Sequence, residues 1–265
     1  MVFYDAINNR LVYLNQGTDS VFWDKHWQTN SLQSILKTPP KNRFITKTTR
    51  KYLQSNSKIL EAGCGMGDKV YSLQEAGFDA YGVDTAQNTV REICKLRPQI
   101  KIKVADVRKL PFEDGYFDGC WSLGVIEHFW DGYDHVFREM KRVIRGNGYL
   151  FLTFPQISFL RHIKIRRNKY LNFDPTELDL NTFYQFIFDS EKVKKDLKWY
   201  GFMPVYECGQ GGLKGLKDEI KLLRPFLQKI YDGQSLFTKS LHMGLNIVLS
   251  KWTGHTKFIV FRKST

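Results

Sequence analysis

The chain has 265 residues, of which 42% are hydrophobic and 15% are aromatic, and Lys and Arg exceed Asp and Glu by 13. Such a content of apolar residues suffices for a buried core and excludes a disordered chain over most of the length. The four cysteines stand at positions 64, 94, 120 and 208 without any C-x-x-C spacing. We therefore expect free thiols, no metal site and no disulfide framework.

No targeting or membrane-spanning segment is evident. Residues 1–10 lack a basic start followed by an apolar run, which a secretory signal would need. The longest apolar stretch, Leu241–Leu249, is broken by Gly244 and Asn246 and is too short to cross a bilayer. The sequence thus predicts a cytoplasmic protein with no integral membrane segment.

The amino-terminal residues 1–57 show no strand pattern and are expected to be helical. They carry an aromatic cluster, Phe22-Trp-Asp-Lys-His-Trp27, at a spacing that fits an amphipathic helix. Trp23 and Trp27 either fix this helix to the body of the protein or supply an apolar cover for a bound substrate. Both alternatives stay open at this point.

A strand followed by a glycine-rich turn is predicted at Ile59–Lys69. Two apolar residues end in the acid Glu61, and glycines follow at 63, 65 and 67. Alternating glycines indicate a turn where the backbone comes close to a ligand, because only glycine leaves the space. A dinucleotide-binding turn would carry a third glycine where this chain has Asp68, so a dehydrogenase is disfavoured.

Three further predicted strands follow, and two of them end in an acid. Asp79–Asp84 ends in a carboxylate 21 residues after Gly63, the place from which an acid accepts hydrogen bonds from ribose hydroxyls in doubly wound sheets. Ile100–Asp106 ends in a second carboxylate, and Phe117–Leu123 forms the next strand. Met140–Phe154 is predicted to be a helix end, a turn and a fifth strand.

These features in this order resemble class I S-adenosylmethionine-dependent methyltransferases, in particular the type 11-like group. The pattern E-x-G-x-G-x-G at Glu61–Gly67 resembles the first motif of the family, and residues 140–154 resemble its L-K-P-G-G segment with Arg145 and Asn147 substituted. The resemblance implies an α/β fold with a doubly wound, mostly parallel, seven-stranded Rossmann-like sheet. It also implies S-adenosyl-L-methionine as the cofactor and S-adenosyl-L-homocysteine as the product.

The resemblance further implies an organisation of the chain and a set of cofactor contacts. A helical lid is expected at 1–57 and a methyltransferase domain at 58–265, with substrate-cap insertions at about 155–190 and 209–252. The implied cofactor-binding residues lie at the ends of the first four predicted strands: Glu61, Ala62, Gly63, Cys64, Gly65, Gly67, Asp84, Thr85, Asp106, Val107, Ser122 and Leu123. Cys64 is more simply a small filler of the turn than a nucleophile, since no partner base is identifiable.

His128 is the candidate catalytic residue. An oxygen or nitrogen acceptor must lose its proton, which calls for a base that titrates near neutral pH. His128 directly follows the fourth predicted strand and would lie near the transferred methyl group if the resemblance holds. Alternatively its ring packs against the methionine part of the cofactor, and His26, His162 and Tyr133 are lesser candidates for the base.

The carboxyl-terminal part carries most of the excess charge. Residues 1–154 hold 21 basic and 17 acidic residues, whereas residues 155–265 hold 19 basic and 10 acidic ones. The densest run, Arg161–Lys169, is either a solvated face or a clamp for an anionic substrate, a membrane surface or RNA. Its candidate substrate contacts are Arg161, Arg166 and Arg167.

Helices and strands alternate again after residue 190. The pattern predicts a helix from Ser190 to Tyr200, a strand at 201–207, and an apolar stripe from Leu213 to Ile230 opposite several lysines. Pro225 should kink or divide that stripe, and a helix at about 235–252 and a strand at 256–262 complete the sheet. The basic amphipathic region either packs as a substrate cap or lies peripherally on an anionic membrane.

The methyl acceptor is the least determined property. The place that reads D/N-P-P-Y/F in nitrogen-methylating adenine and cytosine enzymes reads Ser122–Val125 here, and the chain has no Pro-Cys pair for carbon-5 cytosine chemistry. The layout resembles bacterial methyltransferases of small metabolites and glycans, so methyl transfer to an oxygen of a small-molecule or glycan acceptor is expected, with an anionic acceptor suited to the basic run. The alternatives are a tRNA or rRNA methyltransferase and a non-catalytic S-adenosylmethionine-binding partner protein.

Overall fold

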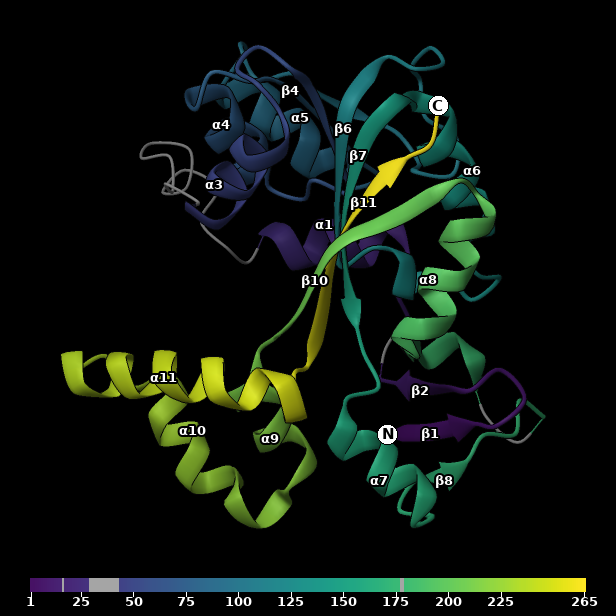
Figure 1. The fold of residues 1–265 in the computed structure, drawn as a ribbon, viewed down its shortest axis with the longest axis vertical. Helices are drawn as coiled ribbons and strands as arrows, with labels where there is room; N and C mark the ends of the chain where they lie inside the picture. The colour runs from purple at the N-terminus through teal and green to yellow at the C-terminus, as the bar shows by residue number, and fades with distance from the viewer. Residues whose placement is uncertain (16, 29–42, 177–178) are drawn as a thin grey trace. The chain divides into compact units, whose positions relative to one another are not determined.

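The computed structural model describes residues 1–15, 17–28, 43–176 and 179–265. Its main sheet has seven strands in the order β10-β11-β7-β6-β3-β4-β5. Figure 1 labels β10, β11, β7, β6 and β4 of this sheet. The strands are β3 (Lys58–Ala62), β4 (Asp79–Asp84), β5 (Ile102–Val104), β6 (Phe117–Leu123), β7 (Ile144–Pro155), β10 (Phe202–Gln210) and β11 (Thr256–Lys263). The predicted α/β class and seven-stranded sheet are confirmed.

The centre of this sheet is parallel, as the predicted alternation of strands and helices requires. Strand β3 pairs in parallel with β4 on one side and with β6 on the other, and β4 pairs in parallel with β5. Ile59 and Leu60 of β3 are fully buried, as expected for a strand covered on both faces. The carboxyl ends of β3, β4 and β6 therefore meet at one edge of the sheet.

Helices alternate with these strands in chain order. They are α1 (Ser20–Gln28), α3 (Arg43–Tyr52), α4 (Asp68–Glu75), α5 (Gln87–Leu96), the short η1 (Ile126–His128), α6 (Asp134–Val143) and α8 (Ser190–Trp199). Trp121 of β6 shows how α3 is attached: its ring stacks on Phe151 at 4.4 Å between centroids, and its Nε1 donates to the Thr49 hydroxyl at 3.0 Å. Trp121 is thus a core residue that is only 1% exposed.

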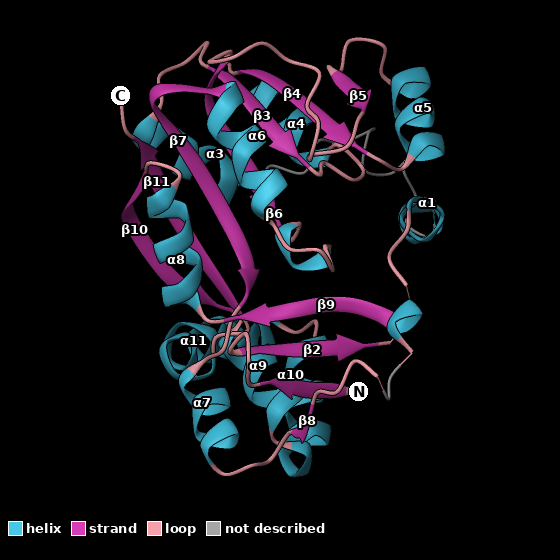
Figure 2. Cartoon of the chain, turned by 90° about the vertical axis from the view of Figure 1, so that its right-hand side faces the viewer, coloured by secondary structure: helices cyan, strands magenta, loops and turns pink. Residues whose placement is uncertain are grey.

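A second sheet of four strands has the order β8-β1-β2-β9. In Figure 2 these strands lie one below another, from β9 down to β8. The strands are β1 (Val2–Asp5), β2 (Arg10–Leu14), β8 (Leu171–Asn172) and β9 (Phe183–Phe188). The prediction that residues 1–57 contain no strand is therefore wrong. Strands β1 and β2 pair with each other as an antiparallel hairpin, and their outer partners β8 and β9 lie more than 150 residues away. A local pattern in strands of four or five residues could not reveal this sheet, because strand formation depends on such neighbours.

The turn between β1 and β2 is held by one carboxylate. Asp5 accepts hydrogen bonds from the backbone and side-chain amides of Asn8 at 3.1 and 2.8 Å, and from Nε of Arg10 at 2.9 Å. Asn9 adopts a left-handed backbone with φ of 47°, which Asn tolerates better than most residues. These contacts fix the register in which Leu11 enters a small core with Ile187.

Helices of the carboxyl-terminal part form a separate cluster. They are α7 (Phe159–Arg166), α9 (Gly212–Glu219), the short η3 (Lys221–Leu223), α10 (Arg224–Asp232) and α11 (Leu236–Thr253). The short η2 (Leu180–Thr182) instead leads directly into β9. The predicted division near Pro225 is confirmed, and Pro225 lies in the first turn of α10, where its missing N–H costs no helical hydrogen bond. Leu213, Leu227 and Ile230 form the core of this cluster.

Contacts between Cα atoms divide the chain into two compact units. The first consists of residues 1–16, 153–195 and 206–259, and the second of residues 17–152, 196–205 and 260–265. This division is not the boundary at residue 57 that the sequence indicated, and the lid and cap assignments stay predictions. Residues 29–42 of the expected lid lie outside the described residues.

Membrane-spanning helices and metal-binding clusters are both absent from the described residues. No helix among them has both the length and the hydropathy to cross a membrane. Within the same part of the chain, no group of three or more His, Cys, Asp or Glu side chains is arranged to hold a metal ion.

Candidate functional site

The glycine turn after β3 is the centre of the candidate site. Gly63, Gly65 and Gly67 all have positive φ, at 81°, 50° and 70°, a conformation that other residues rarely adopt. A Cβ atom at Gly63 would overlap Val125, and one at Gly67 would overlap Ile102. Both backbone conformation and lack of space therefore require glycine here, as the sequence predicted.

Asp84 closes this turn from the end of the neighbouring strand β4. Its Oδ2 accepts a hydrogen bond from the backbone N–H of Gly65 at 2.8 Å, and its Oδ1 accepts one from Ala86 at 2.9 Å. Burial raises the pKa of Asp84, and these backbone donors oppose the rise. Each carboxylate oxygen keeps a further lone pair, so Asp84 can both hold the turn and accept hydrogen bonds from the hydroxyls of a ribose.

Three buried polar atoms near the ends of β3 and β6 have no hydrogen-bond partner among the described residues. They are Oε2 of Glu61, the hydroxyl of Ser122 and Oε2 of Glu127. Glu61 and Ser122 belong to adjacent strands, since β3 pairs with β6 through Glu61 and Trp121. A buried acceptor without a donor is costly, and three of them together fit a ligand that brings positive charge and N–H donors.

The two buried glutamates differ strongly from ordinary carboxyl groups. Burial raises the pKa of Glu61 to about 8, against the opposing effect of Lys69, whose Nζ lies 3.9 Å from Oε1. Burial also raises the pKa of Glu127 to about 8. A cation placed beside either group would favour its ionised form, so both carboxyl groups are suited to a positively charged ligand.

Helix α1 brings two tryptophans to this turn. Trp23 and Trp27 stack at 6.1 Å between ring centroids, and the Trp23 ring meets the His128 ring edge to face at 4.9 Å. The Trp27 ring lies against Gly65, where an added Cβ would come within 2.8 Å of it. Both tryptophans thus lie beside the turn, and their contact with a substrate stays a prediction.

Asp24 attaches α1 to α5, a role that the sequence analysis missed. Its Oδ1 accepts hydrogen bonds from the backbone N–H and hydroxyl of Thr89 at 2.9 and 3.0 Å. Its Oδ2 accepts from the backbone and side-chain amides of Asn88 at 3.3 and 3.1 Å. Helix α5 has Ala86 at its own N-cap position, without a side-chain cap. That missing cap was a signal in the sequence that another segment must supply the acceptor.

His128 lies in η1, the short helix that follows β6, and it is half-buried. Its ring contacts Trp23, as described above, so it faces the two tryptophans of α1. The alternative bases are placed differently. The Tyr133 hydroxyl donates to Asp196 at 2.7 Å, and His26 packs against Trp27 at 4.8 Å. His162 lies on α7 of the first unit.

Asp106, predicted to lie at the adenine, carries an ion pair. Arg108 donates from Nη2 to Oδ2 at 2.8 Å and from Nε to both carboxylate oxygens at 3.1 Å. Partial burial acts to raise the pKa of Asp106, but the hydrogen bonds from Arg108 outweigh it and lower the pKa. The Arg108 guanidinium also lies 5.0 Å from the centre of the Phe129 ring. Asp106 is thus an ionised acceptor at the end of its strand.

The other predicted cofactor residues have the following places. Cys64 is buried in the turn and burial raises the pKa of its thiol well above the usual value, which fits a filler and disfavours a nucleophile. Ala62 and Val107 are buried, whereas Thr85 and Leu123 are half-buried. Direct contacts of these residues with a cofactor stay predictions.

Arg161, predicted as a substrate contact, is engaged inside the first unit. Only 3% of its side chain is exposed; Nε donates to Oε1 of Glu219 at 2.7 Å and Nη1 donates to the carbonyl of Gln156 at 2.7 Å. Arg166 and Arg167, at the end of α7, are exposed. Of the three predicted substrate contacts, therefore, only Arg166 and Arg167 are exposed to solvent. Their contact with a substrate stays a prediction.

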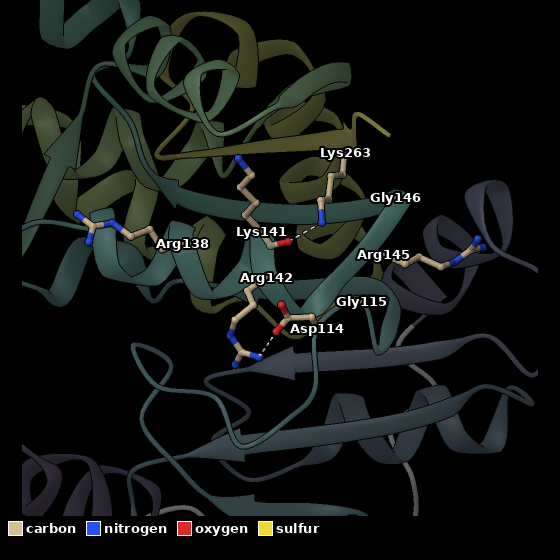
Figure 3. A pocket seen from close by; sticks show the side chains of 8 residues that line it. All are labelled: Asp114, Gly115, Arg138, Lys141, Arg142, Arg145, Gly146 and Lys263. Carbon is tan, nitrogen blue, oxygen red and sulfur yellow. Dashed lines mark hydrogen bonds and ion pairs between the residues drawn. The ribbon is translucent and has the colours of Figure 1, made fainter.

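A basic depression of about 530 Å³ lies elsewhere in the second unit (Figure 3). Asp114, Gly115, Arg138, Lys141, Arg142, Arg145, Gly146 and Lys263 line it. Its residues come from the loop before β6, from α6, from the start of β7 and from the end of β11, whereas the glycine turn follows the end of β3. Arg142 is paired with Asp114 and Glu139, and Lys263 donates to the carbonyls of Lys141 and Ile144 at 2.6 Å. These cations are largely occupied by the protein itself.

Comparison with known proteins agrees with this site. Residues 60–152 match the family model described as a methyltransferase domain. A probable S-adenosylmethionine-dependent methyltransferase of Mycobacterium tuberculosis is 28% identical over 152 residues, which cover 57% of this chain and 50% of that protein. The 2-methyl-6-phytyl-1,4-hydroquinone methyltransferase of Synechocystis is 32% identical over 106 residues, covering 38% of this chain and 33% of that protein. The chain thus spans about half the length, or less, of these relatives.

Solved structures share the fold. A candidate sarcosine dimethylglycine methyltransferase of Galdieria sulphuraria superposes with a TM-score of 0.52 at 17% identity, covering 84% of each chain. At this identity the likeness supports the fold and leaves the chemistry to the residues of the site.

Proposed function

We propose that the protein is an S-adenosylmethionine-dependent methyltransferase that transfers a methyl group to an oxygen of a small-molecule or glycan acceptor. Residues 60–152 match the model of a methyltransferase domain, and the Mycobacterium tuberculosis relative is named for such an activity. The observation that carries this proposal is the set of unpartnered buried atoms beside the glycine turn. S-adenosylmethionine combines a ribose with a cationic sulfonium and ammonium group. These are the groups that Asp84, Glu61 and Glu127 are suited to bind.

The protein's contribution to the reaction is positioning, exclusion of water and removal of a proton. The cofactor supplies a methyl group already activated on sulfur. Asp84 would hold the ribose hydroxyls while keeping the turn closed through Gly65. Trp23 and Trp27 would cover the site against water. These roles need no metal ligand or covalent intermediate on the protein.

His128 is proposed as the base for an oxygen acceptor. Its ring contacts the ring of Trp23 in a half-buried position beyond the end of β6. There the imidazole would accept the proton of the acceptor hydroxyl as that oxygen forms its bond to the methyl carbon. An imidazole suits this step because it exchanges a proton near neutral pH.

The acceptor class rests on the relatives and on the charge of the chain. The Synechocystis relative is named for a hydroquinone, and this name favours a small-molecule acceptor. The excess of Lys and Arg over Asp and Glu suits an acceptor with a negative group, such as a phosphate or an acidic sugar. The surplus of positive charge favours RNA as the acceptor, which is the alternative. Guanidinium groups such as those of Arg142 and Arg161, however, are already paired with carboxylates of the protein itself.

Transfer of labelled methyl groups tests this proposal. The purified protein would be incubated with tritium-labelled S-adenosylmethionine and a cell extract that is then divided into nucleic-acid, polar metabolite or glycan, and lipid fractions. We expect label in the metabolite or glycan fraction, and none with the Asp84→Ala variant. Label confined to nuclease-sensitive material would show RNA as the acceptor instead. Absence of label with the cofactor still bound would support a non-catalytic binding protein.

A further inference from the structure

The first unit exposes an unusually apolar helix surface that the proposed reaction does not use. We define the α10–α11 surface by six side chains: Phe226, Phe237, Met243, Ile247, Val248 and Trp252. All are half or more exposed, with Ile247 at 74% and Phe237 at 75%. Exposed apolar side chains grouped on adjacent elements mark an interaction surface more often than single ones do.

Helix α11 is apolar on two faces, and only one of them is packed. Leu241 and Leu245 turn inward against the core formed by α9 and α10. Met243, Ile247 and Val248 lie on the outward face of the same turns, since residues three or four apart share a helix face. In Figure 1, α11 lies along α9 and α10. At its carboxyl-terminal end the Trp252 ring also meets the Phe159 ring of α7 at 5.3 Å between centroids. A soluble helix normally places polar residues on its outer face.

The charge around this surface is of one sign. Residues 221–254 contain five Lys or Arg residues and a single acid, Asp232, and α11 itself contains no acid. Lys239 and Lys251 are exposed on the outward side of α11. The Lys251 ammonium lies 5.7 Å from the centre of the Trp252 ring. Long lysine side chains can keep their charge in water while their stems lie along an apolar surface.

We propose that the α10–α11 surface docks on an anionic lipid membrane, lying in the plane of the headgroups. Apolar side chains fringed by lysines and a terminal tryptophan are the pattern that binds such an interface. A second copy of the chain fits less well, because a symmetric pair would bring two clusters of the same sign together. The proposal stands independently of the methyl acceptor.

Vesicle flotation of the full-length chain tests the docking. Vesicles of phosphatidylcholine alone would be compared with vesicles in which part of the lipid is replaced by phosphatidylglycerol. We expect the protein to float with the anionic vesicles, to remain behind with the neutral ones, and to be released by salt. Equal binding to both kinds of vesicle, or binding to neither, would overturn the proposal.

Two variants separate the apolar and the charged contributions. Ile247→Asn with Val248→Asn keeps the charge and should weaken binding to anionic vesicles by at least about tenfold. Lys239→Gln with Lys251→Gln should weaken it by about tenfold or more. Lys95→Gln with Lys109→Gln, two exposed lysines of the second unit, is the charge-matched control and should bind like the unmodified protein.

Two controls test whether the variants are folded and whether the surface binds a second copy of the chain. Circular dichroism and thermal unfolding should be the same for all variants, because the changed side chains are exposed. Sedimentation velocity without lipid should show a monomer. A dimer that the Ile247→Asn, Val248→Asn variant dissolves would assign this surface to a second copy of the chain and refute the membrane proposal.

Discussion

At the scale of single residues, the site is defined by carboxyl groups in unlike surroundings. Asp84 accepts two backbone hydrogen bonds, Asp106 is held by Arg108, and Glu127 is buried without a partner for one oxygen. Asp84 and Asp106 could be predicted from the sequence, because an acid that follows a strand of a doubly wound sheet lies at the edge of the sheet where ligands bind. Glu127 could not be singled out, since its burial depends on how η1 packs against the sheet.

Glu127 should make the unliganded protein less stable at alkaline pH. Its pKa rises from about 4.5 in the unfolded chain to about 8 in the fold, so the folded state holds the proton more tightly. The contribution of protonated Glu127 to the free energy of unfolding is complete below the pKa of the unfolded chain. It is lost as the pH rises towards 8, the pKa in the fold. Urea unfolding at pH 5 and at pH 8 gives the free energy of unfolding at each pH. Between these two pH values it should fall by about 3 kcal/mol less in Glu127→Gln than in the unmodified protein.

Glu75 offers the matched control for that experiment, because it is an exposed glutamate on α4. Glu75→Gln should leave the pH dependence of stability as it is in the unmodified protein. If Glu127→Gln also leaves it unchanged, the buried carboxyl group is not protonated in the fold, and its proposed readiness for a cationic ligand is contradicted.

His128 carries the proposed proton transfer. His128→Ala should lower the rate of methyl transfer at least about tenfold, because the acceptor oxygen would then lose its base. The affinity for S-adenosylhomocysteine should change little. The measurement is the rate with the extract fraction that takes up label, together with a calorimetric titration. An unaltered rate would remove His128 as the base.

At the scale of helices and strands, α1 depends on one acid for its attachment to α5. Asp24→Ala removes four hydrogen bonds to Asn88 and Thr89 and leaves the first turn of α5 uncapped. Loss of a cap costs about 1 kcal/mol, and the two tryptophans of α1 should leave the turn more often. We expect weaker binding of S-adenosylhomocysteine and faster proteolysis within α1. Lys25→Ala, exposed on the same helix, should change neither.

The elements that the sequence predicted well are those with a long or strongly marked pattern. Strand β4 and strand β6 have the predicted bounds, and α11 begins and ends within two residues of the prediction. The strands β1 and β2 were missed because they are short and because their outer partners, β8 beside β1 and β9 beside β2, are remote in the sequence. The physical reason is that strand formation depends on cross-strand neighbours more than on the strand's own residues.

At the scale of the whole molecule, the excess charge of the carboxyl-terminal part has two different roles. The number of basic residues can be read from the sequence, but which of them form ion pairs is determined by the fold. Arg161 and Lys164 both reach the buried Glu219, whereas the lysines of α11 are exposed beside apolar side chains. The single basic run seen in the sequence is therefore partly structural.

Glu219 should be important for the stability of the first unit and not for cofactor binding. Its carboxylate accepts hydrogen bonds from Arg161, Lys164 and the hydroxyl of Tyr170. These partners lower its pKa despite burial. Glu219→Gln should destabilise the first unit by about 3 kcal/mol, because it leaves buried cations without their counter-charge. Urea unfolding measures this loss, and reduced affinity for S-adenosylhomocysteine would contradict a purely structural role.

The most direct test of the account is calorimetric titration of S-adenosylhomocysteine into the unmodified protein and into Asp84→Ala. Asp84 holds the glycine turn through Gly65 and faces the proposed ribose site. We predict binding at one site per chain and an affinity lowered at least about tenfold in the variant, which corresponds to about 1.4 kcal/mol. Equal binding by both proteins would contradict the assignment of the ligand to the glycine turn, and no binding by the unmodified protein would contradict the assignment of the cofactor.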